Sequence, residues 1–289
     1  MEGQREHGIP RGAVEAFAEY LYEQECARLT VKKYCGDIRV FLGYLGEEQR
    51  ITREGLLQYK EWLSGRYAVA SVNSMLAALN RFLKYLGLGN LRVRRLRVQR
   101  QLFLQQEREM TEKEYARLQQ EARGQGKKQL ALLMETLAGT GARIGELSYF
   151  TVEQIRRGQV EIRHKGKHRR ILLPGNLKAR LLVYAVLQGI KKGPLFISKN
   201  GRPKDRSNIW REMKALGEKA GVQPNKIFPH NLRHLFARSY YQMTRDLAGL
   251  ADLLGHSSLE VTRVYTAKPV KAYQSAVDRL GESRIKNTT

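Results

Sequence analysis

The first hundred residues contain four stretches in which apolar side chains recur every three or four positions. This is the spacing of one buried helix face, so we expect four helices. We expect Thr30, Thr52 and Ser71 to cap the second, third and fourth helices, and Gly87 to end the last. Short segments between the helices predict a compact bundle. The four apolar stripes are Val14, Phe17, Ala18 and Leu21; Tyr34, Ile38, Phe41, Leu42 and Leu45; Leu56, Tyr59, Trp62 and Leu63; and Val72, Met75, Leu76, Leu79, Phe82, Leu83 and Leu86.

The pattern then changes, because no apolar helical stripe organises the residues that follow. Five arginines fall within nine positions here: Arg92, Arg94, Arg95, Arg97 and Arg100. We interpret residues 91–109 as a basic linker that follows a phosphate backbone. The alternative is a charge run that contacts water alone.

A second domain is expected to begin near Thr111, where Thr111 and Glu114 have the spacing of a capping box. A helix around 129–137 should end at a glycine-rich break at 139–141. Apolar pairs at 160–162 and 171–173 predict two short strands joined by a basic turn, and the chain after Asn176 has mainly helical spacing. The expected fold is mainly α (α+β), with a helical domain at 10–90, the linker at 91–109 and a mostly helical domain with a small sheet at 110–289.

Charge indicates the partner. Lys and Arg number 52 against 28 Asp and Glu, which gives a net charge of +24 among 289 residues. Basic side chains that neutralise phosphates release condensed counterions, so nucleic acid is the expected ligand. A basic membrane-surface protein is the alternative.

Cysteine usage and hydropathy suggest the compartment. Only Cys26 and Cys35 are present, and they form no CxxC pair. Neither a zinc site nor a disulfide framework is therefore expected. No stretch approaches the roughly 18 apolar residues of a membrane helix, and the N-terminus has no apolar signal core. We expect a cytoplasmic protein.

Two basic residues in the second domain are candidates for phosphate chemistry. Arg143 follows a glycine turn, and Glu146 lies three positions later, so a carboxylate could hold a buried guanidinium that binds phosphate. Lys165 lies in the turn between the two strands, from which its ammonium group could protonate a leaving oxygen. Taken alone, each is also compatible with an ordinary surface position.

Further candidates lie near the C-terminus. His230, Arg233 and His234 share one helix face by their spacing, but the Glu of an HExxH zinc motif is absent. His256 follows Leu253-Leu254-Gly255 and is expected at a helix end. Tyr265 comes nine residues later, but it is one of 14 tyrosines. A structural histidine is the alternative interpretation for His230 and, more strongly, for His234.

The order of these residues carries more information than any one of them. Arg143, Lys165, His230-x-x-Arg233, Leu-Leu-Gly-His256 and Tyr265 together resemble the tyrosine recombinase (phage integrase) family, in its short two-domain form. The resemblance extends over nearly the whole chain, and residues 140–265 carry its specific part. Thr266 departs from the many members in which His follows soon after the tyrosine. The short segment before Val14 predicts no separate arm-binding domain.

The resemblance implies a role for each matched residue. Tyr265 would be the nucleophile, Arg143, Arg233 and His256 would bind the phosphate, and His230 would move a proton or support the phosphate. Lys165 would be the general acid, although Lys167 in the same turn is an alternative. Glu146 and His234 would support the site, and Lys167 and the linker arginines would contact DNA.

The implied reaction is cleavage and rejoining of DNA strands through a 3′-phosphotyrosine. No GxxxxGK[ST] loop and no clustered carboxylates for paired magnesium ions are found, so neither ATP, another cofactor nor a metal is expected.

The implied partners are double-stranded recombination sites, three further copies of the chain, and accessory DNA-bending or directionality factors. The implied location is the prokaryotic nucleoid. A C-terminal helix at 270–280 would link the tetramer by docking on a neighbouring protomer. The alternatives are a type IB topoisomerase, a DNA-binding protein without catalysis, and an RNA-binding module, although no RNP-like or KH signature is found.

Overall fold

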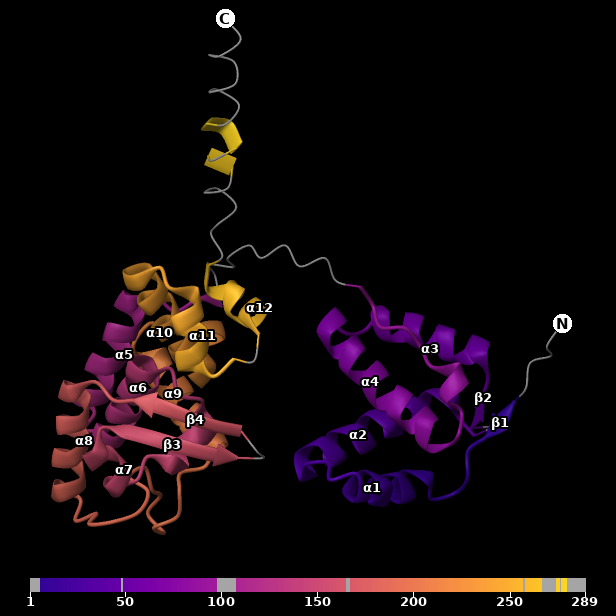
Figure 1. Cartoon of the computed structure of the whole chain (residues 1–289), viewed down its shortest axis with the longest axis horizontal. Coiled ribbons are helices and arrows are strands. Elements are labelled where there is room, and N and C mark those ends of the chain that lie inside the picture. The colour runs from indigo at the N-terminus through magenta and orange to yellow at the C-terminus, as the bar shows by residue number, and fades with distance from the viewer. Residues whose placement is uncertain are drawn as a thin grey trace, which may run out of the picture. The chain divides into compact units, whose positions relative to one another are not determined.

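A computed structural model describes residues 6–47, 49–97, 108–164, 167–256, 258–266, 274–275 and 277–279, with residues 163, 164 and 167 described in their backbone alone. The chain divides into two compact units, residues 1–100 and 101–289. Helices dominate both units, and each contains one two-stranded antiparallel sheet (Figure 1). The predicted fold class is confirmed. None of the helices in the described ranges is long and apolar enough to cross a membrane.

Unit 1 is a bundle of four helices. Its core joins α2, α3 and α4 around Phe41, Tyr59 and Leu76, and α1 adds Phe17 and Leu21 against α2 and α4. The short β1–β2 ladder, which the hydrophobic pattern did not predict, pairs His7 with Ile51. The elements are β1 (His7–Gly8), α1 (Ala13–Glu23), α2 (Arg28–Leu45), β2 (Arg50–Ile51), α3 (Arg53–Ser64), α4 (Val69–Tyr85) and the 3₁₀ turn η1 (Gly89–Leu91).

One of the three predicted helix caps in unit 1 is correct. Thr52 accepts a hydrogen bond from the Gly55 amide at 2.9 Å, as an N-cap should. Thr30 and Ser71 are not caps, because their own amides already bond Ala27 O at 2.7 Å and Ala68 O at 2.8 Å. Both residues lie in the first helical turn, so α2 and α4 begin earlier than the polar side chains suggest.

The arginine-rich segment after η1 is fastened to α4 by two asparagines. Asn80 bonds both the amide and the carbonyl of Val93, at 2.8 and 2.9 Å. Asn73 does the same for Leu96, at 2.7 and 3.0 Å. Val93 is buried, whereas the four described arginines of this segment are exposed; these are Arg92, Arg94, Arg95 and Arg97. Arg100 lies outside the described residues.

Unit 2 is mostly helical around one large core. The capping box at Thr111 and Glu114 is present, and β3 pairs with β4 in the expected hairpin. The helix predicted at 129–137 runs on to Thr140, because Gly139 is tolerated within it. The elements are α5 (Glu112–Gly124), α6 (Lys128–Thr140), η3 (Ile144–Tyr149), α7 (Val152–Arg157), β3 (Gln159–His164), β4 (Lys167–Leu172), α8 (Gly175–Leu187), α9 (Arg206–Lys219), η4 (Pro224–Lys226), α10 (Pro229–Thr244), α11 (Leu247–Leu254), α12 (Leu259–Thr262) and η5 (Arg263–Thr266).

The C-terminal end of α6 packs too closely against α10 and α11 for a side chain. Gly141 has a φ of +63°, and a Cβ there would lie 2.5 Å from Phe236 and 2.8 Å from Leu254. Such a φ strongly favours glycine. This close approach brings the start of η3, the middle of α10 and the end of α11 together, and these three places carry most of the candidate site.

Most of the predicted C-terminal helix at 270–280 lies outside the described residues. The parts that the structure describes, 274–275 and 277–279, are helical.

Asn80 offers a test of how unit 1 holds the arginine-rich segment. Asn80→Ala should lower the free energy of unfolding of unit 1 by about 2 kcal/mol, because two backbone groups at Val93 lose their partner. Urea unfolding followed by tryptophan fluorescence measures this in a Trp210→Phe background, where Trp62 of unit 1 is the remaining tryptophan. Asn90→Ala, at an exposed position of η1, is the matched control and should stay within about 0.5 kcal/mol. Equal effects of the two changes would contradict the fastening role.

Candidate active site

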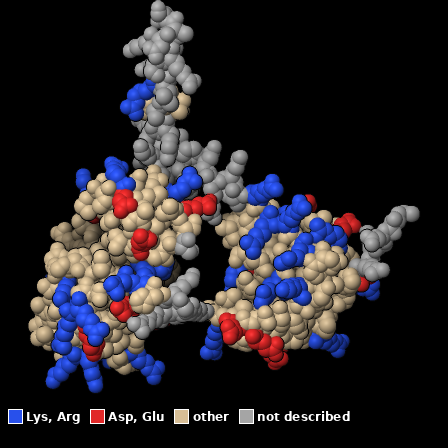
Figure 2. Space-filling view, in the orientation of Figure 1, with Lys and Arg blue, Asp and Glu red and all other residues tan. Residues whose placement is uncertain are grey.

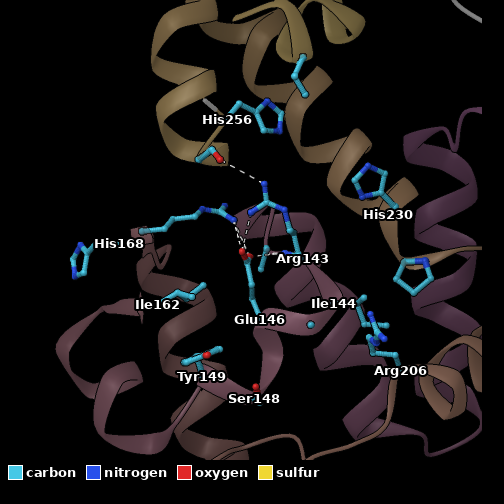
Figure 3. A pocket seen from close by; sticks show the side chains of 16 residues that line it. Arg143, Ile144, Glu146, Ser148, Tyr149, Ile162, His168, Arg206, His230 and His256 are labelled. Carbon is cyan, nitrogen blue, oxygen red and sulfur yellow. Dashed lines mark hydrogen bonds and ion pairs between the residues drawn. The ribbon is translucent and has the colours of Figure 1, made fainter. Parts of the chain in front are cut away.

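A cavity of about 1100 Å³ opens in unit 2 at the junction of η3, the β hairpin and the start of α10. Its wall includes Arg143, Glu146, Arg169, His230 and His256. Figure 3 shows Glu146 bound to two arginines, with His256 and His230 on different sides of them and His168 pointing away. Four of the predicted site residues therefore line one hollow.

Arg143 is presented to this cavity by the break after Gly141. Its Nη1 lies 2.9 Å from Glu146 Oε1, and its backbone amide donates to Glu146 Oε2 at 2.7 Å. The ion pair expected from the spacing is therefore present. The expected burial of Arg143 is wrong, because its side chain is 43% exposed. Glu146 binds the guanidinium on one side, and the cavity leaves the rest of it open.

Arg169, on β4, is a buried cation that the sequence analysis missed. Its Nη1 lies 2.8 and 2.7 Å from the two oxygens of Glu146, and its Nη2 donates to Leu253 O at 2.9 Å. The side chain is 9% exposed. Burial lowers the pKa of the Arg169 guanidinium, and the charge of Glu146 opposes that shift.

Arg233, on α10, is buried beneath the cavity with a residue exposure of 1%. Its guanidinium donates to Gly141 O at 2.5 Å, to Leu254 O at 2.7 Å and to His256 Nε2 at 3.0 Å. Its Nε has no hydrogen-bond partner among the described residues. Burial, and then the charges of Arg143 and Arg169, lower its pKa to about 10, so it remains charged at neutral pH.

His256 follows the αL residue Gly255 at the end of α11, as expected. A guanidinium only donates hydrogen bonds, so His256 Nε2 must accept from Arg233. The ring proton then lies on Nδ1, which is 2.9 Å from Thr262 Oγ1. Desolvation, followed by the charges of Arg233, Arg143 and Arg169, lowers the pKa of His256 to about 4. The ring is therefore neutral at pH 7.

His230 and His234 lie one turn apart on α10, with ring centroids 4.7 Å apart. The His230 ring is open to the cavity, yet desolvation by the surrounding protein lowers its pKa to about 4, helped by His234 and the charge of Arg233. His234 lies deeper. It contacts Glu109 at 3.4 Å, and that carboxylate also forms a 2.8 Å ion pair with Arg238.

Tyr265 is held by η5 against these histidines. Its ring meets His234 edge to face at 5.2 Å and stacks with His256 at 6.3 Å between centroids. The residue is 7% exposed and packs in a small apolar cluster with Ala237, Leu250 and Leu254. Burial raises the pKa of the Tyr265 phenol, and the charge of Arg233 works against this rise. The phenol is therefore protonated at neutral pH.

The hairpin tip carries the remaining candidates. Lys165 lies outside the described residues, and so does the side chain of Lys167. The strands on either side are paired up to His164 and Lys167.

Three site residues escaped the sequence analysis for a common reason. Arg169 and Glu109 contact residues that are distant in the chain, and Thr262 contacts His256 across the boundary between α11 and α12, so no helical spacing identifies any of the three. Glu146 was predicted from its spacing to Arg143. The sequence did not predict that the same carboxylate also binds Arg169. No group of three or more His, Cys, Asp or Glu side chains in the described ranges is placed to hold a metal ion.

Two family models match the chain. The model described as the phage integrase family matches residues 108–271, and the N-terminal SAM-like domain of phage integrase matches residues 14–88. The chain belongs to the phage integrase family and is an enzyme of the tyrosine-type site-specific recombinase class. The resemblance inferred from the ordered motif residues is therefore confirmed.

Individual relatives agree over nearly the full length. Tyrosine recombinase XerA of Pyrococcus furiosus is 29% identical over 286 residues, covering 95% of this chain and 96% of its own. Tyrosine recombinase XerD of Vibrio cholerae is 29% identical over 276 residues, covering 89% and 91%. A lambda integrase tetramer bound to a Holliday junction matches with a TM-score of 0.71 at 18% identity, covering 91% of this chain and 78% of that one. At that identity the last match concerns the fold alone.

The contact between His256 and Thr262 gives a prediction that needs no DNA. Thr262→Val should remove the acceptor of Nδ1–H and change the nitrogen-15 chemical shift of Nδ1, while the Arg233 guanidinium keeps Nε2 an acceptor. Thr262→Ser keeps the hydroxyl and should preserve the shift, which is measured at pH 7. An unchanged Nδ1 shift in Thr262→Val would contradict the contact.

The two depressed histidine pKa values predict loss of stability in weak acid. The folded state holds His230 and His256 neutral down to about pH 4, whereas an unfolded histidine binds a proton below about 6.5. The free energy of unfolding should therefore fall as the pH drops from about 6.5 to 5. Urea unfolding at a series of pH values tests this. The double variant His230→Gln, His256→Gln should show a flatter profile over that interval, and an equally steep profile would contradict the assignment.

Proposed function

We propose that this recombinase cleaves and rejoins DNA through a covalent bond between Tyr265 and a 3′ phosphate. The observation that carries the proposal is the convergence of Arg143, Arg233, His230 and His256 around one position of unit 2, with the Tyr265 ring stacked on His256. A phosphodiester anion repels nucleophiles, so a site that attacks one must supply positive charge. This arrangement supplies two guanidinium groups.

Arg143 and Arg233 have different roles in binding the phosphate, because one is exposed and the other is buried. Arg143 is open to the hollow and meets the phosphate as it arrives. Arg233 is preformed: packing fixes its position, and it contacts a non-bridging oxygen once a small shift releases part of its bonds to Gly141 O and Leu254 O. Preorganised donors of this kind contribute roughly 3–4 kcal/mol each to comparable transition states.

The bound phosphate also changes the histidines. Both rings are neutral in the free protein because cations and desolvation depress their pKa values. A phosphate anion offsets those cations, so it raises both values toward neutrality. His230 then takes the proton of the Tyr265 phenol. The protonated His256 ring donates from Nε2 to the phosphate in place of accepting from Arg233, while its Nδ1–H donates to the Thr262 hydroxyl.

The chemical step balances without an outside reagent. The Tyr265 oxygen forms a bond to phosphorus as the bond to the 5′ oxygen breaks, and Lys165 gives the leaving oxygen a proton. Lys167 is the alternative donor. The phosphotyrosine retains the energy of the cleaved bond, so the reverse attack by a 5′ hydroxyl rejoins the strand without ATP.

In the free protein the phenol is turned inward. Neither Arg233 nor Tyr265 is among the described residues that line the cavity, and Tyr265 is 7% exposed. Attack therefore requires η5 to present the ring to the phosphate. This movement withdraws Tyr265 from its cluster with Ala237, Leu250 and Leu254.

Duplex DNA bearing a recombination site is the proposed substrate, with unit 1 as its core-binding domain. Figure 2 shows Lys and Arg side chains gathered on the visible face of unit 1. The exposed arginines of 92–97 add to this charge, and neutralised phosphates release counterions. The domain boundaries at 10–90, 91–109 and 110–289 are part of this proposal.

Assembly into a tetramer completes the proposal. Exchange between two duplexes cuts four strands, so it uses four copies of the site. Lambda integrase forms a tetramer on a Holliday junction, and XerH has been seen bound to its difH substrate. The segment 270–280 is the proposed link between protomers, and accessory DNA-bending factors are further proposed partners.

Removing the phenolic oxygen of Tyr265 tests whether this residue is the nucleophile. A nicked duplex from the ends of the element that encodes the chain should yield a covalent protein–DNA band in EDTA, because the fragment released at the nick diffuses away and prevents rejoining. Tyr265→Phe should reduce this band at least 1000-fold, since no other oxygen replaces the nucleophile. Denaturing gels with labelled DNA measure it.

Tyr241→Phe is the matched control, because Tyr241 packs in the same apolar cluster. That variant should form the adduct at the normal level. An adduct that survives in Tyr265→Phe would refute the assignment, and a requirement for a divalent cation would refute the metal-free step.

A further inference from the structure

One carboxylate in the cavity binds two guanidinium groups. Glu146 receives the Arg143 amide, Arg143 Nη1 and two contacts from Arg169 Nη1, all between 2.7 and 2.9 Å. The Glu146 side chain is 12% exposed, so water screens these contacts weakly. Arg143, Arg169 and Glu146 are thus one electrostatic unit, which Figure 3 shows as the fan of dashed lines at Glu146.

The net charge of this unit determines how strongly it attracts a phosphate anion. Two guanidinium groups and one carboxylate leave a net charge of +1. If Arg169 were absent, Glu146 and Arg143 would form a neutral pair. A neutral pair attracts a phosphate far less than a net cation does, because the carboxylate repels it almost as strongly as the guanidinium attracts it.

Arg169 is also bound to the turn that precedes His256. Its Nη2 donates to Leu253 O in the last turn of α11. The turn accommodates the Arg169 chain only because residue 255 is glycine, where a Cβ would lie 2.6 Å from Arg169 Cδ. The next residue is His256. One side chain of β4 therefore joins the Arg143–Glu146 pair to the turn that presents His256.

We propose that Arg169 is a positioning residue of the active site, which offsets the charge of Glu146 so that Arg143 keeps a net positive charge for the phosphate. Glu146 can then fix the geometry of Arg143 without cancelling its attraction for the substrate. The inference rests on the proposed function insofar as it takes a phosphate to be the ligand of the cavity.

The test uses inorganic phosphate and the free protein, so it does not depend on DNA cleavage. Binding is followed through the NMR signals of the His256 ring, which lies in the cavity wall. Arg169→Met should raise the dissociation constant for phosphate roughly tenfold, the order expected for loss of one unit charge a few ångströms away. Arg169→Lys, which keeps the charge, should bind phosphate more tightly than Arg169→Met.

A second change separates charge from geometry. The double variant Arg169→Met, Glu146→Gln restores the net charge of +1 and should recover most of the phosphate affinity lost in Arg169→Met. If Arg169 served only to shape the site, removal of Glu146 as well would leave the affinity unchanged or weaken it further. Either of those results would overturn the proposal.

Arg170→Met is the matched control for the loss of a charge on β4. Arg170 is the next residue of the strand, is exposed and pairs with Glu161 at 3.7 Å, away from the cavity. The phosphate affinity of the Arg170→Met variant should change less than threefold. A tenfold loss in this variant would overturn the claim that the effect is specific to the charge of Arg169. Thermal unfolding establishes that each variant is folded.

The adduct assay distinguishes failure of this inference from failure of the proposed function. The charge account predicts that Arg169→Met slows adduct formation and that Glu146→Gln partly restores it in the double variant. The expected phosphate results without any wild-type adduct would refute phosphotyrosine formation and leave the role of Arg169 intact. A normal wild-type adduct with unchanged phosphate binding in Arg169→Met would refute the role of Arg169 alone.

Discussion

The burial of Arg233 is the constraint on which the site depends. A guanidinium removed from water is costly unless its donors are satisfied. Here the last turn of α6 supplies Gly141 O, the last turn of α11 supplies Leu254 O, and His256 supplies a ring nitrogen. Carbonyls at helix C-termini carry partial negative charge, so two helix ends stabilise one cation. The same contacts bring the ends of α6 and α11 together around α10.

In the free site the arginines and Glu146 are therefore charged, whereas the two histidines and the tyrosine are neutral. Arg233 keeps its proton, whereas His230 and His256 are neutral and the Tyr265 phenol is protonated. Desolvation is the main cause of the pKa shift in each case, because it disfavours the charged form of every one of these groups. The neighbouring arginines lower the pKa values of the two histidines further. An anion in the cavity would reverse the balance for the histidines. In this account the substrate itself prepares the acid and base groups that act on it.

The local parts of this structure could be predicted from sequence, and the reason is that they depend on local spacing. The capping box at Thr111, the β hairpin and the helix that carries His230 and Arg233 all follow from residues within one or two turns of each other. The caps at Thr30 and Ser71 were wrong because a polar residue in the first helical turn has the same sequence signature as a true cap.

The site was less predictable where it depends on tertiary contacts. The motif residues were found through their order, yet the burial of Arg233 and the exposure of Arg143 were not, since burial is set by the packing of α6, α10 and α11. Arg169 was not predicted as a site residue. Its role emerges only when β4 is placed beside η3 and the end of α11.

The most direct test is to identify the residue that carries the DNA after cleavage. A trapped complex, digested with nuclease and trypsin, should yield one tryptic peptide with a nucleotide attached, and fragmentation in a mass spectrometer locates the modified side chain. The account predicts the peptide that begins at Val264, with the nucleotide on Tyr265. A nucleotide on Tyr240 or Tyr241, or on any serine, would contradict it.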